Sequence, residues 1–363
     1  MAVRGRRATD DGRRAARDEV LVRVGDLAGR PRGTGFVADH HGTVVTSHEA
    51  VDGLARIVVR ATGDRVCVVT SDAVTPLPAL DLALIRTEGL CVDPLPFALR
   101  DEVGTGAYVR IAAGGWREAR VLGTADVTYT ATDGFHLLRG AMELAIGTAG
   151  SEALRLGGGA AGGPVLDVTT GAVVGVLGTA LEAQHRATGF AVPLRGWRSE
   201  RPLAELLARN AATVGAYGTD LNLAGVLELT ATTVGSDGPG AAAGAVAATG
   251  GPAPVERTDV VSEFTAFTEG PATVLGLVGP PGSGRTTELA ALAARRGRDP
   301  EPAPTLWLRG ADLLADDDSV ADAARRALER AGRIVAASWA AGVPGTGGAP
   351  AGSPGSTGST GSM

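Results

Sequence analysis

Residues 157–167 read GGGAAGGPVLD, and the interpretation of the whole chain starts from this stretch. Glycine dominates its first part, which allows the backbone to turn tightly and to approach other segments closely. A proline then opens a short apolar run that is typical of a buried strand. The stretch therefore predicts a tight glycine loop that leads into the core of a β-rich domain.

The bulk composition describes a globular protein whose core is made mostly of small aliphatic residues. The chain has 363 residues, of which 44% are hydrophobic but only 4% aromatic, and this length allows two domains. A net charge of -6 argues against a nucleic-acid partner, and the absence of a long apolar run argues against a membrane partner. The start of the chain has no apolar signal core, so we expect a cytoplasmic protein.

The basic residues are unusual because all 34 are arginine and none is lysine. Such a bias is typical of a high-GC bacterial genome. An arginine at a position where a motif normally has lysine is therefore weak evidence that the function of the motif has been lost.

Changes in composition along the chain predict its domain organisation. Short β-type runs separated by glycine, aspartate and proline predict a mainly β fold, a sandwich or a pair of barrels. A later apolar run, a glycine-rich turn and a helical pattern predict a partial α/β unit. We expect an Arg-rich flexible arm at 1–18, the β domain at 19–200, a helical extension at 201–234, a Gly/Ala/Pro linker at 235–256, the partial α/β segment at 257–338 and a disordered low-complexity tail at 339–363.

Two further motifs precede the glycine loop, and their order along the chain carries a family resemblance. GTGFVADHHGTVVTSHEAV at 33–51 contains His48, and LDLALIR at 80–86 contains Asp81. Together with GGGAAGGPVLD they resemble the trypsin-like serine peptidases, nearest the HtrA-type branch, over about residues 16–200. The resemblance implies the double β-barrel chymotrypsin-like fold.

The same resemblance implies roles for individual residues. His48 would be the general base, Asp81 would orient its imidazole, and Gly159 and Ala161 would supply the backbone N–H groups of the oxyanion hole. Taken alone, a histidine in such a run is more often structural, and Asp81 could simply close a turn. The motifs in register favour the catalytic interpretation.

Ala161 stands where the family has its nucleophilic serine. A methyl group cannot attack a carbonyl, and losing the nucleophile lowers turnover by about a millionfold. Ser47 and Ser151 are not placed by the motifs to replace it. A replacement of serine, whether natural or introduced, leaves this pattern, so we expect a serine endopeptidase domain that is inactive as written and that needs no cofactor.

The resemblance implies a peptide or protein substrate. It says less about the residues that would contact the substrate than about the catalytic residues. Arg155 would lie near the base of the substrate pocket, or point outward and leave a small apolar pocket. The run ATGFAVP would form a sheet edge for substrate backbone, with the residues Gly189, Phe190 and Ala191. The sequence does not indicate an oligomeric state.

GPPGSGRT at 279–286 matches a phosphate-binding P-loop except that arginine replaces lysine. This segment resembles the opening part of a STAND- or NACHT-like module, which implies ATP and Mg²⁺ as ligands, with Thr286 on the metal. The residues that would contact nucleotide are Gly279, Gly282, Gly284, Arg285, Thr286 and Thr287. A chance glycine-rich turn is the simpler alternative.

Two other functions stay open at this point. A natural pseudopeptidase would keep the fold as a peptide- or protein-binding regulatory module. A nucleotide-dependent switch protein would depend mainly on the P-loop segment.

Overall fold

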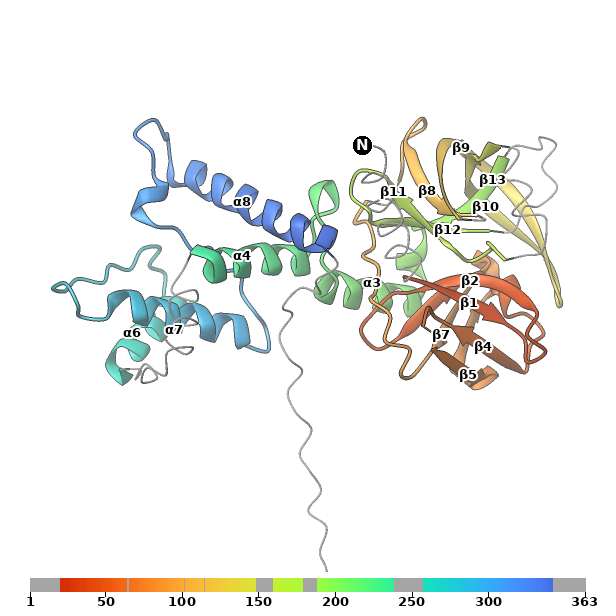
Figure 1. The fold of residues 1–363 in the computed structure, drawn as a ribbon, viewed down its shortest axis with the longest axis horizontal. Coiled ribbons are helices and arrows are strands. Elements are labelled where there is room, and N and C mark those ends of the chain that lie inside the picture. Colours follow the sequence, from red (N-terminus) through yellow and green to blue (C-terminus); the bar gives the residue numbers. More distant parts are fainter. Residues whose placement is uncertain are drawn as a thin grey trace, which may run out of the picture. The chain divides into compact units, whose positions relative to one another are not determined.

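A computed structural model describes residues 20–63, 65–100, 102–113, 115–147, 159–178, 188–237 and 257–341 (Figure 1). The arm predicted at 1–18 lies outside these residues, as do most of the predicted linker and tail. The chain divides into two compact units, residues 1–228 with 299–304 and residues 229–298 with 305–363. Each unit is described by itself.

The N-terminal part of the first unit is a seven-stranded antiparallel sheet with the order β5-β4-β1-β2-β3-β7-β6. Its long-range pairings join β1 to both β2 and β4 and join β3 to β7. The strands are β1 (Leu21–Gly25), β2 (Pro31–Val37), β3 (Thr43–Thr46), β4 (Arg56–Arg60), β5 (Val66–Thr70), β6 (Val74–Leu77) and β7 (Leu82–Arg86). The short 3-10 helices are η1 (His48–Ala50), η2 (Ser71–Ala73) and η3 (Pro78–Leu80).

The second part of the same unit is a closed barrel with the strand order β10-β13-β12-β11-β8-β9. Its strands are β8 (Tyr108–Ala112), β9 (Trp116–Ala131), β10 (Gly134–Ala145), β11 (Pro164–Asp167), β12 (Val173–Leu177) and β13 (Thr188–Pro193). β9 and β10 form one long hairpin whose pairing begins at Gly134 and Ala131. The expected mainly β, chymotrypsin-like architecture is confirmed, with a sheet in the N-terminal half and a closed barrel after it.

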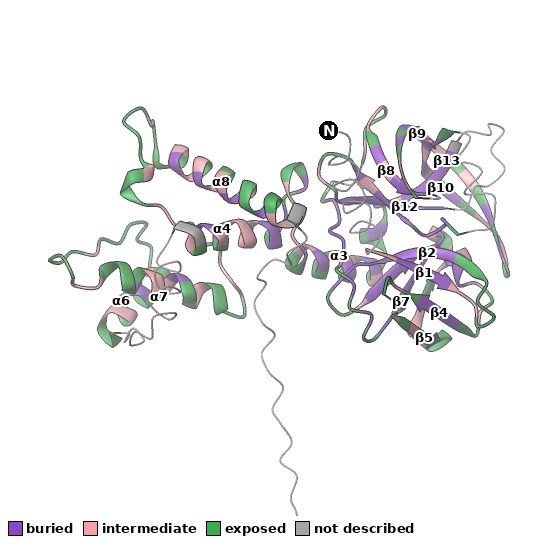
Figure 2. Ribbon diagram, in the orientation of Figure 1, coloured by how far each residue is buried: buried purple, intermediate pink, exposed green. Residues whose placement is uncertain are grey.

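The central strands of the N-terminal sheet are buried on both faces, and the period of two along a strand explains how. In β7, Leu82 and Leu84 pack into the core shared with the barrel, while Ala83 and Ile85 pack into the separate core of the sheet. Successive side chains of a strand point to opposite faces, so one apolar run serves two cores. Figure 2 shows buried residues along β2 and β7, and exposed residues in β5.

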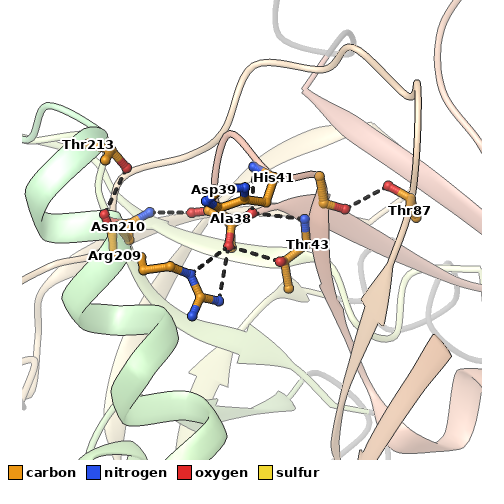
Figure 3. A network of polar contacts seen from close by, with 9 residues as sticks. Ala38, Asp39, His41, Thr43, Thr87, Arg209, Asn210 and Thr213 are labelled. Atoms are coloured by element: carbon orange, nitrogen blue, oxygen red, sulfur yellow. Dashed lines mark hydrogen bonds and ion pairs between the residues drawn. The ribbon is translucent and has the colours of Figure 1, made fainter. Parts of the chain in front are cut away.

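The predicted helical extension begins as α3 (Arg201–Thr213), which follows η4 (Trp197–Ser199) and is anchored by polar contacts to loops that connect the β-strands. The Asn210 side chain is fully buried, accepts a bond from the amide of Phe97 at 2.9 Å, and donates to the carbonyls of Ala38 at 2.7 Å and Leu95 at 2.8 Å. The preceding residue, Arg209, reaches the buried carboxylate of Asp39 at 3.2 Å (Figure 3). α3 is therefore an integral part of the first unit.

The remaining regular elements are helical. After η5 (Gly218–Asp220) comes α4 (Leu223–Asp237), which lies partly in each unit, and the second unit continues with α6 (Thr258–Glu269), α7 (Arg285–Arg298), η6 (Gly310–Asp312) and α8 (Val320–Ala341). The helical pattern expected after the glycine-rich turn is present as α7, whereas the helix α6 before the turn was not predicted.

The two strands expected in the α/β segment are absent, and this expectation is wrong. No strand forms at residues 272–279 or 305–310, and the second range ends where the 3-10 helix η6 begins. Val274 and Val278 are 83% and 97% exposed. A parallel sheet requires helices on both faces and several strands to bury its apolar runs. The two runs alone do not provide that burial, and the regular elements in the described part of the second unit are all helices.

Candidate active site

The glycine loop at 159–163 is held against β2 through its carbonyl groups. The carbonyl of Ala161 accepts a hydrogen bond from the amide of Thr34 at 2.8 Å, and the hydroxyl of Thr34 donates to the carbonyl of Gly159. The carbonyl of Ala160 accepts from the amide of Gly163 at 3.2 Å. The loop is therefore fixed on one side by the strand that begins the first motif.

Glycine is required at position 162 by both backbone conformation and space. Gly162 has φ +85°, and a Cβ there would lie 2.6 Å from the amide nitrogen of Ser47 and closer still to Thr34 and Thr46. Backbone at positive φ favours glycine because other side chains clash there. The loop thus lies directly against the residues that precede His48.

The backbone amides of Gly159 and Ala161 differ from the carbonyls of the same residues in their hydrogen bonding. Neither N–H group has a hydrogen-bond partner within the described part of the chain, although the carbonyls of both residues do. Ala161 is only 3% exposed, and a buried N–H group normally finds a partner. Free amides in such a loop are the arrangement that stabilises an oxyanion.

The predicted base, His48, begins η1 and is 8% exposed. Its Nδ1 lies 3.3 Å from the hydroxyl oxygen of Tyr129, and the rings meet edge to face with centroids 6.3 Å apart. The Tyr129 hydroxyl donates to the carbonyl of Pro78 at 2.6 Å. Burial lowers the pKa of the imidazole, and the carboxylates of Asp52 and Asp133 oppose that shift.

Asp81 lies between η3 and β7 in the left-handed region, with φ 48°, and is 1% exposed. Its Oδ1 accepts from the hydroxyl of Ser47 at 2.7 Å and from the amide of Glu49 at 3.3 Å. Burial raises the pKa of the carboxyl to about 7, although the bond from Ser47 favours the charged form. The Asp81 carboxyl is therefore held by the residues on either side of His48.

The predicted pair of His48 and Asp81 is brought into the same loop cluster without being joined. Among the described residues, no hydrogen bond connects the imidazole to the carboxyl group. The Nδ1 atom that would face a carboxylate in a working triad faces Tyr129 instead. A cavity of about 200 Å³ lies beside His48, between the side chains of Asp52, Leu54, Ile57 and Val74 and other residues of the sheet.

Among the described residues, the proposed substrate-pairing strand β13 is paired with β10 alone at Gly189 and is bonded on both sides at Phe190 and Ala191. β13 lies between β10 and β12 in the closed barrel, with Gly189 and Phe190 opposite β10 and Ala191 paired on both sides. The carbonyl of Phe190 also accepts from the amide of Gly178 at 2.9 Å. At Ala191 barrel closure uses the hydrogen-bonding groups that an added strand would need, whereas the side of Gly189 that faces away from β10 has no strand partner among the described residues. Arg155, the predicted pocket residue, lies outside the described residues.

The predicted nucleotide-contacting residues lie in a turn at the start of α7. Gly282 and Gly284 both have φ +82°, α7 begins at Arg285, and Thr286 and Thr287 are exposed. The strand that should precede such a loop is absent, so the described residues lack the strand-loop-helix unit that holds a magnesium nucleotide. No cluster of three or more potential metal ligands occurs among the described residues.

Sequence reasoning missed three residues that shape this site. Thr34 fixes the glycine loop, Ser47 binds Asp81, and Tyr129 contacts His48. Thr34 could have been found because it stands between glycines at the start of a motif. Tyr129 gave no signal, since a tyrosine in an alternating strand reads as core and its partner is far away in sequence.

Comparison with known proteins supports the peptidase interpretation of the first unit. Residues 33–176 match the family model described as "Trypsin-like peptidase domain". A search of curated proteins found no match to the chain. Residues 33–176 therefore have the sequence pattern of a trypsin-like serine protease-type domain.

Similar solved structures are themselves proteases. The Rv3671c protease of M. tuberculosis in its active form is 25% identical, with 57% of this chain and 87% of that chain covered and a TM-score of 0.41. The MamO protease domain of Magnetospirillum magneticum is 23% identical, with 49% and 93% covered and a TM-score of 0.37. A serine endoprotease of Yersinia pestis is 16% identical, with 54% and 66% covered and a TM-score of 0.38.

None of the helices in the described ranges is both long enough and apolar enough to cross a membrane.

Proposed function

We propose that the first unit is a trypsin-like serine endopeptidase domain for peptide or protein substrates, in which Ala161 occupies the nucleophile position. The observation that carries the proposal is the loop at 159–163, where the carbonyls of Gly159 and Ala161 bond to Thr34 and the amides of the same two residues have no partner in the described part of the chain. Gly162 of this loop lies against the backbone of Ser47, the residue that directly precedes His48.

The chemistry follows from these positions. With a serine at position 161, Nε2 of His48 would take the hydroxyl proton as the oxygen attacks a peptide carbonyl. The negative oxygen of the tetrahedral intermediate would accept hydrogen bonds from the amides of Gly159 and Ala161. Asp81 would stabilise the imidazolium once the two side chains pair. With alanine at position 161 the first step has no nucleophile, so the chain as written forms no acyl-enzyme.

The direct test is hydrolysis by an Ala161→Ser variant. We expect release of fluorescence from a dye-quenched protein substrate, and loss of that activity when His48→Ala is added. The unaltered chain is the matched blank. An Ala161→Ser protein that stays folded but hydrolyses nothing across neutral pH, with several protein substrates, would contradict the proposal.

A second function, that of a peptide-binding pseudopeptidase, is favoured by one specific observation. Besides lacking a nucleophile, the site holds His48 against Tyr129 rather than against Asp81, while the amides of Gly159 and Ala161 make no hydrogen bond to any described residue. A peptide that ends in a carboxylate could place an oxygen on those amides. Calorimetric titration of the unaltered chain with such peptides tests this function. The function requires that the unaltered chain binds these peptides and that the Ala161→Ser variant hydrolyses no substrate.

The nucleotide-dependent switch stays a prediction. The turn with Gly282 and Gly284 before α7 supports it, and the exposed, irregular run at 272–279 counts against it. Titration of the full chain with ATP and Mg²⁺ tests it. Binding that is lost in a Thr286→Ala variant would favour the switch.

A further inference from the structure

We propose that Tyr129 is a positioning residue that holds the imidazole of His48 away from Asp81, so that the β9–β10 hairpin determines whether the base is paired with its carboxylate. This inference rests on the proposed function, because it concerns the state of the same base. It begins from the contact between the Tyr129 hydroxyl and Nδ1 of His48, at 3.3 Å.

The hydrogen-bond directions at Tyr129 define the state of His48. A tyrosine hydroxyl has one hydrogen to donate, and that of Tyr129 goes to the carbonyl of Pro78 at 2.6 Å. Its oxygen can then only accept from Nδ1, so Nδ1 carries the proton and Nε2 keeps its lone pair. The tautomer is the one that a general base needs, but the acceptor is a neutral phenol instead of a carboxylate.

The tip of the hairpin fixes Tyr129 in this place. The ring of Tyr129 is 1% exposed and stacks on the imidazole of His136, with centroids 5.2 Å apart and an interplanar angle of 22°. Asp52, which follows η1, accepts from the amide of Thr132 at 2.5 Å and from its hydroxyl at 2.7 Å. The hairpin is thereby joined to the loop that carries His48.

Charged and titratable groups surround His48 from every neighbouring element. Asp52 and Glu49 belong to its own loop, Asp133 and His136 come from the hairpin tip, and Asp81 comes from the turn before β7. Asp133 is paired with His136 at 3.0 Å. Of the carboxylates, only Asp81 is held by groups immediately on both sides of His48, through the Ser47 hydroxyl and the Glu49 amide.

Release of the imidazole from Tyr129 therefore has a defined consequence. The Nδ1–H group loses its acceptor, and a rotation of the His48 side chain toward Asp81 replaces a neutral acceptor with an ionisable one. A carboxylate stabilises the imidazolium far more than a phenol does, so the pKa of His48 rises and that of Asp81 falls. The β9–β10 hairpin would in this way keep the pKa of His48 low until the hairpin moves away.

The test measures the titration of His48 in the chain as it is, with Ala161 in place. In protein with ¹⁵N-labelled histidine, long-range ¹H–¹⁵N spectra report the tautomer and pKa of each ring, and a His48→Gln sample assigns the signal. We expect Tyr129→Phe to raise the pKa of His48 by about one unit or more. Tyr108→Phe, on the exposed side of β8, is the matched control and should leave it unchanged.

A double variant separates the proposed mechanism from general loosening of the fold. In an Asp81→Asn background, Tyr129→Phe should no longer raise the pKa of His48. Thr132→Val removes one hydrogen bond between the hairpin and Asp52 and should also raise the pKa of His48, by a smaller amount. This variant replaces Tyr129→Phe in the test if Tyr129→Phe does not fold. An unchanged pKa in both folded variants, or a rise that persists without Asp81, would overturn the inference. None of these readouts depends on hydrolysis, so they stand apart from the test of the proposed function.

Discussion

The amide of Thr34 and the carbonyl of Ala161 are joined by a hydrogen bond of 2.8 Å. Thr34 belongs to β2 of the N-terminal sheet, and Ala161 belongs to the loop that enters β11 of the barrel. The bond therefore ties the two β-parts of the first unit together at the position proposed for the nucleophile. The shape of this loop is set by the strand opposite it as much as by its own glycines.

Replacing Gly162 with alanine should disrupt that arrangement. The added Cβ would lie 2.6 Å from the amide nitrogen of Ser47, in a backbone with φ +85°. Because the neighbouring atoms include backbone that cannot move aside, we expect a loss of about 3 kcal/mol or more in the free energy of unfolding. Gly171→Ala is the matched control, since Gly171 also has positive φ but nothing within 4 Å of its Cβ position.

The control should cost only about 1 kcal/mol, from backbone strain alone. Thermal unfolding followed by calorimetry measures both variants. Equal losses for the two glycine variants would show that packing of the loop against Ser47 is unimportant.

Asp81 should make folding stability depend on pH in a direction opposite to that of a typical surface carboxylate. Its pKa is about 7 in the folded chain, above the ordinary value of 3.8 that applies when the chain is unfolded. Between these values the unfolded state has lost a proton that the folded state keeps, so stability falls as the pH rises through this window. Above pH 7 the full cost of the buried charge is present.

An Asp81→Asn variant avoids that cost because its side chain does not ionise. Relative to the unaltered chain it should gain stability that is near zero below about pH 4 and reaches roughly 4 kcal/mol above pH 7. Calorimetric Tm values at several pH values measure the difference. A gain that is the same at low and high pH would contradict the burial of an ionisable Asp81.

Asn210 should be essential for the stability of the first unit even though it lies in α3. Its removal leaves the amide of Phe97 and the carbonyls of Ala38 and Leu95 without their partner in a fully buried place. We expect Asn210→Ala to lower the free energy of unfolding by about 3 kcal/mol or more. Thr213→Ala, at an exposed position of the same helix, should change it by less than about 0.5 kcal/mol.

Hydrogen exchange of the amides in β2 and in residues 95–97 reports the effect locally. If those amides exchange as slowly in Asn210→Ala as in Thr213→Ala, then α3 is not an integral part of this unit.

Local patterns in the sequence predicted those structural features that depend on residues close to one another in the chain. Alternating apolar residues predicted the strands, and glycine, proline and charge predicted the loops and helices. The order of His48, Asp81 and Ala161 predicted the glycine loop beside the base, which the contact between Gly162 and Ser47 supports. These signals are carried by short stretches, so one sequence contains them.

What escaped prediction depends on contacts between distant segments. The place of β13 inside the barrel follows from its pairing with both β10 and β12, which no local pattern contains. The run at 272–279 is apolar enough for a strand, but the described part of the second unit has no strand for it to pair with, so its composition misled. Tyr129 meets His48 only because the long β9–β10 hairpin reaches the first part of the fold.

The central claim is that residue 161 faces a base and an oxyanion hole. The most direct measurement is the mass of an Ala161→Ser protein after reaction with a fluorophosphonate, with the modified peptide mapped by fragmentation. The account predicts one added phosphonyl group, located on residue 161 and absent when His48→Ala is also present. A folded Ala161→Ser protein that gains no mass, or gains it at another residue, would contradict the account.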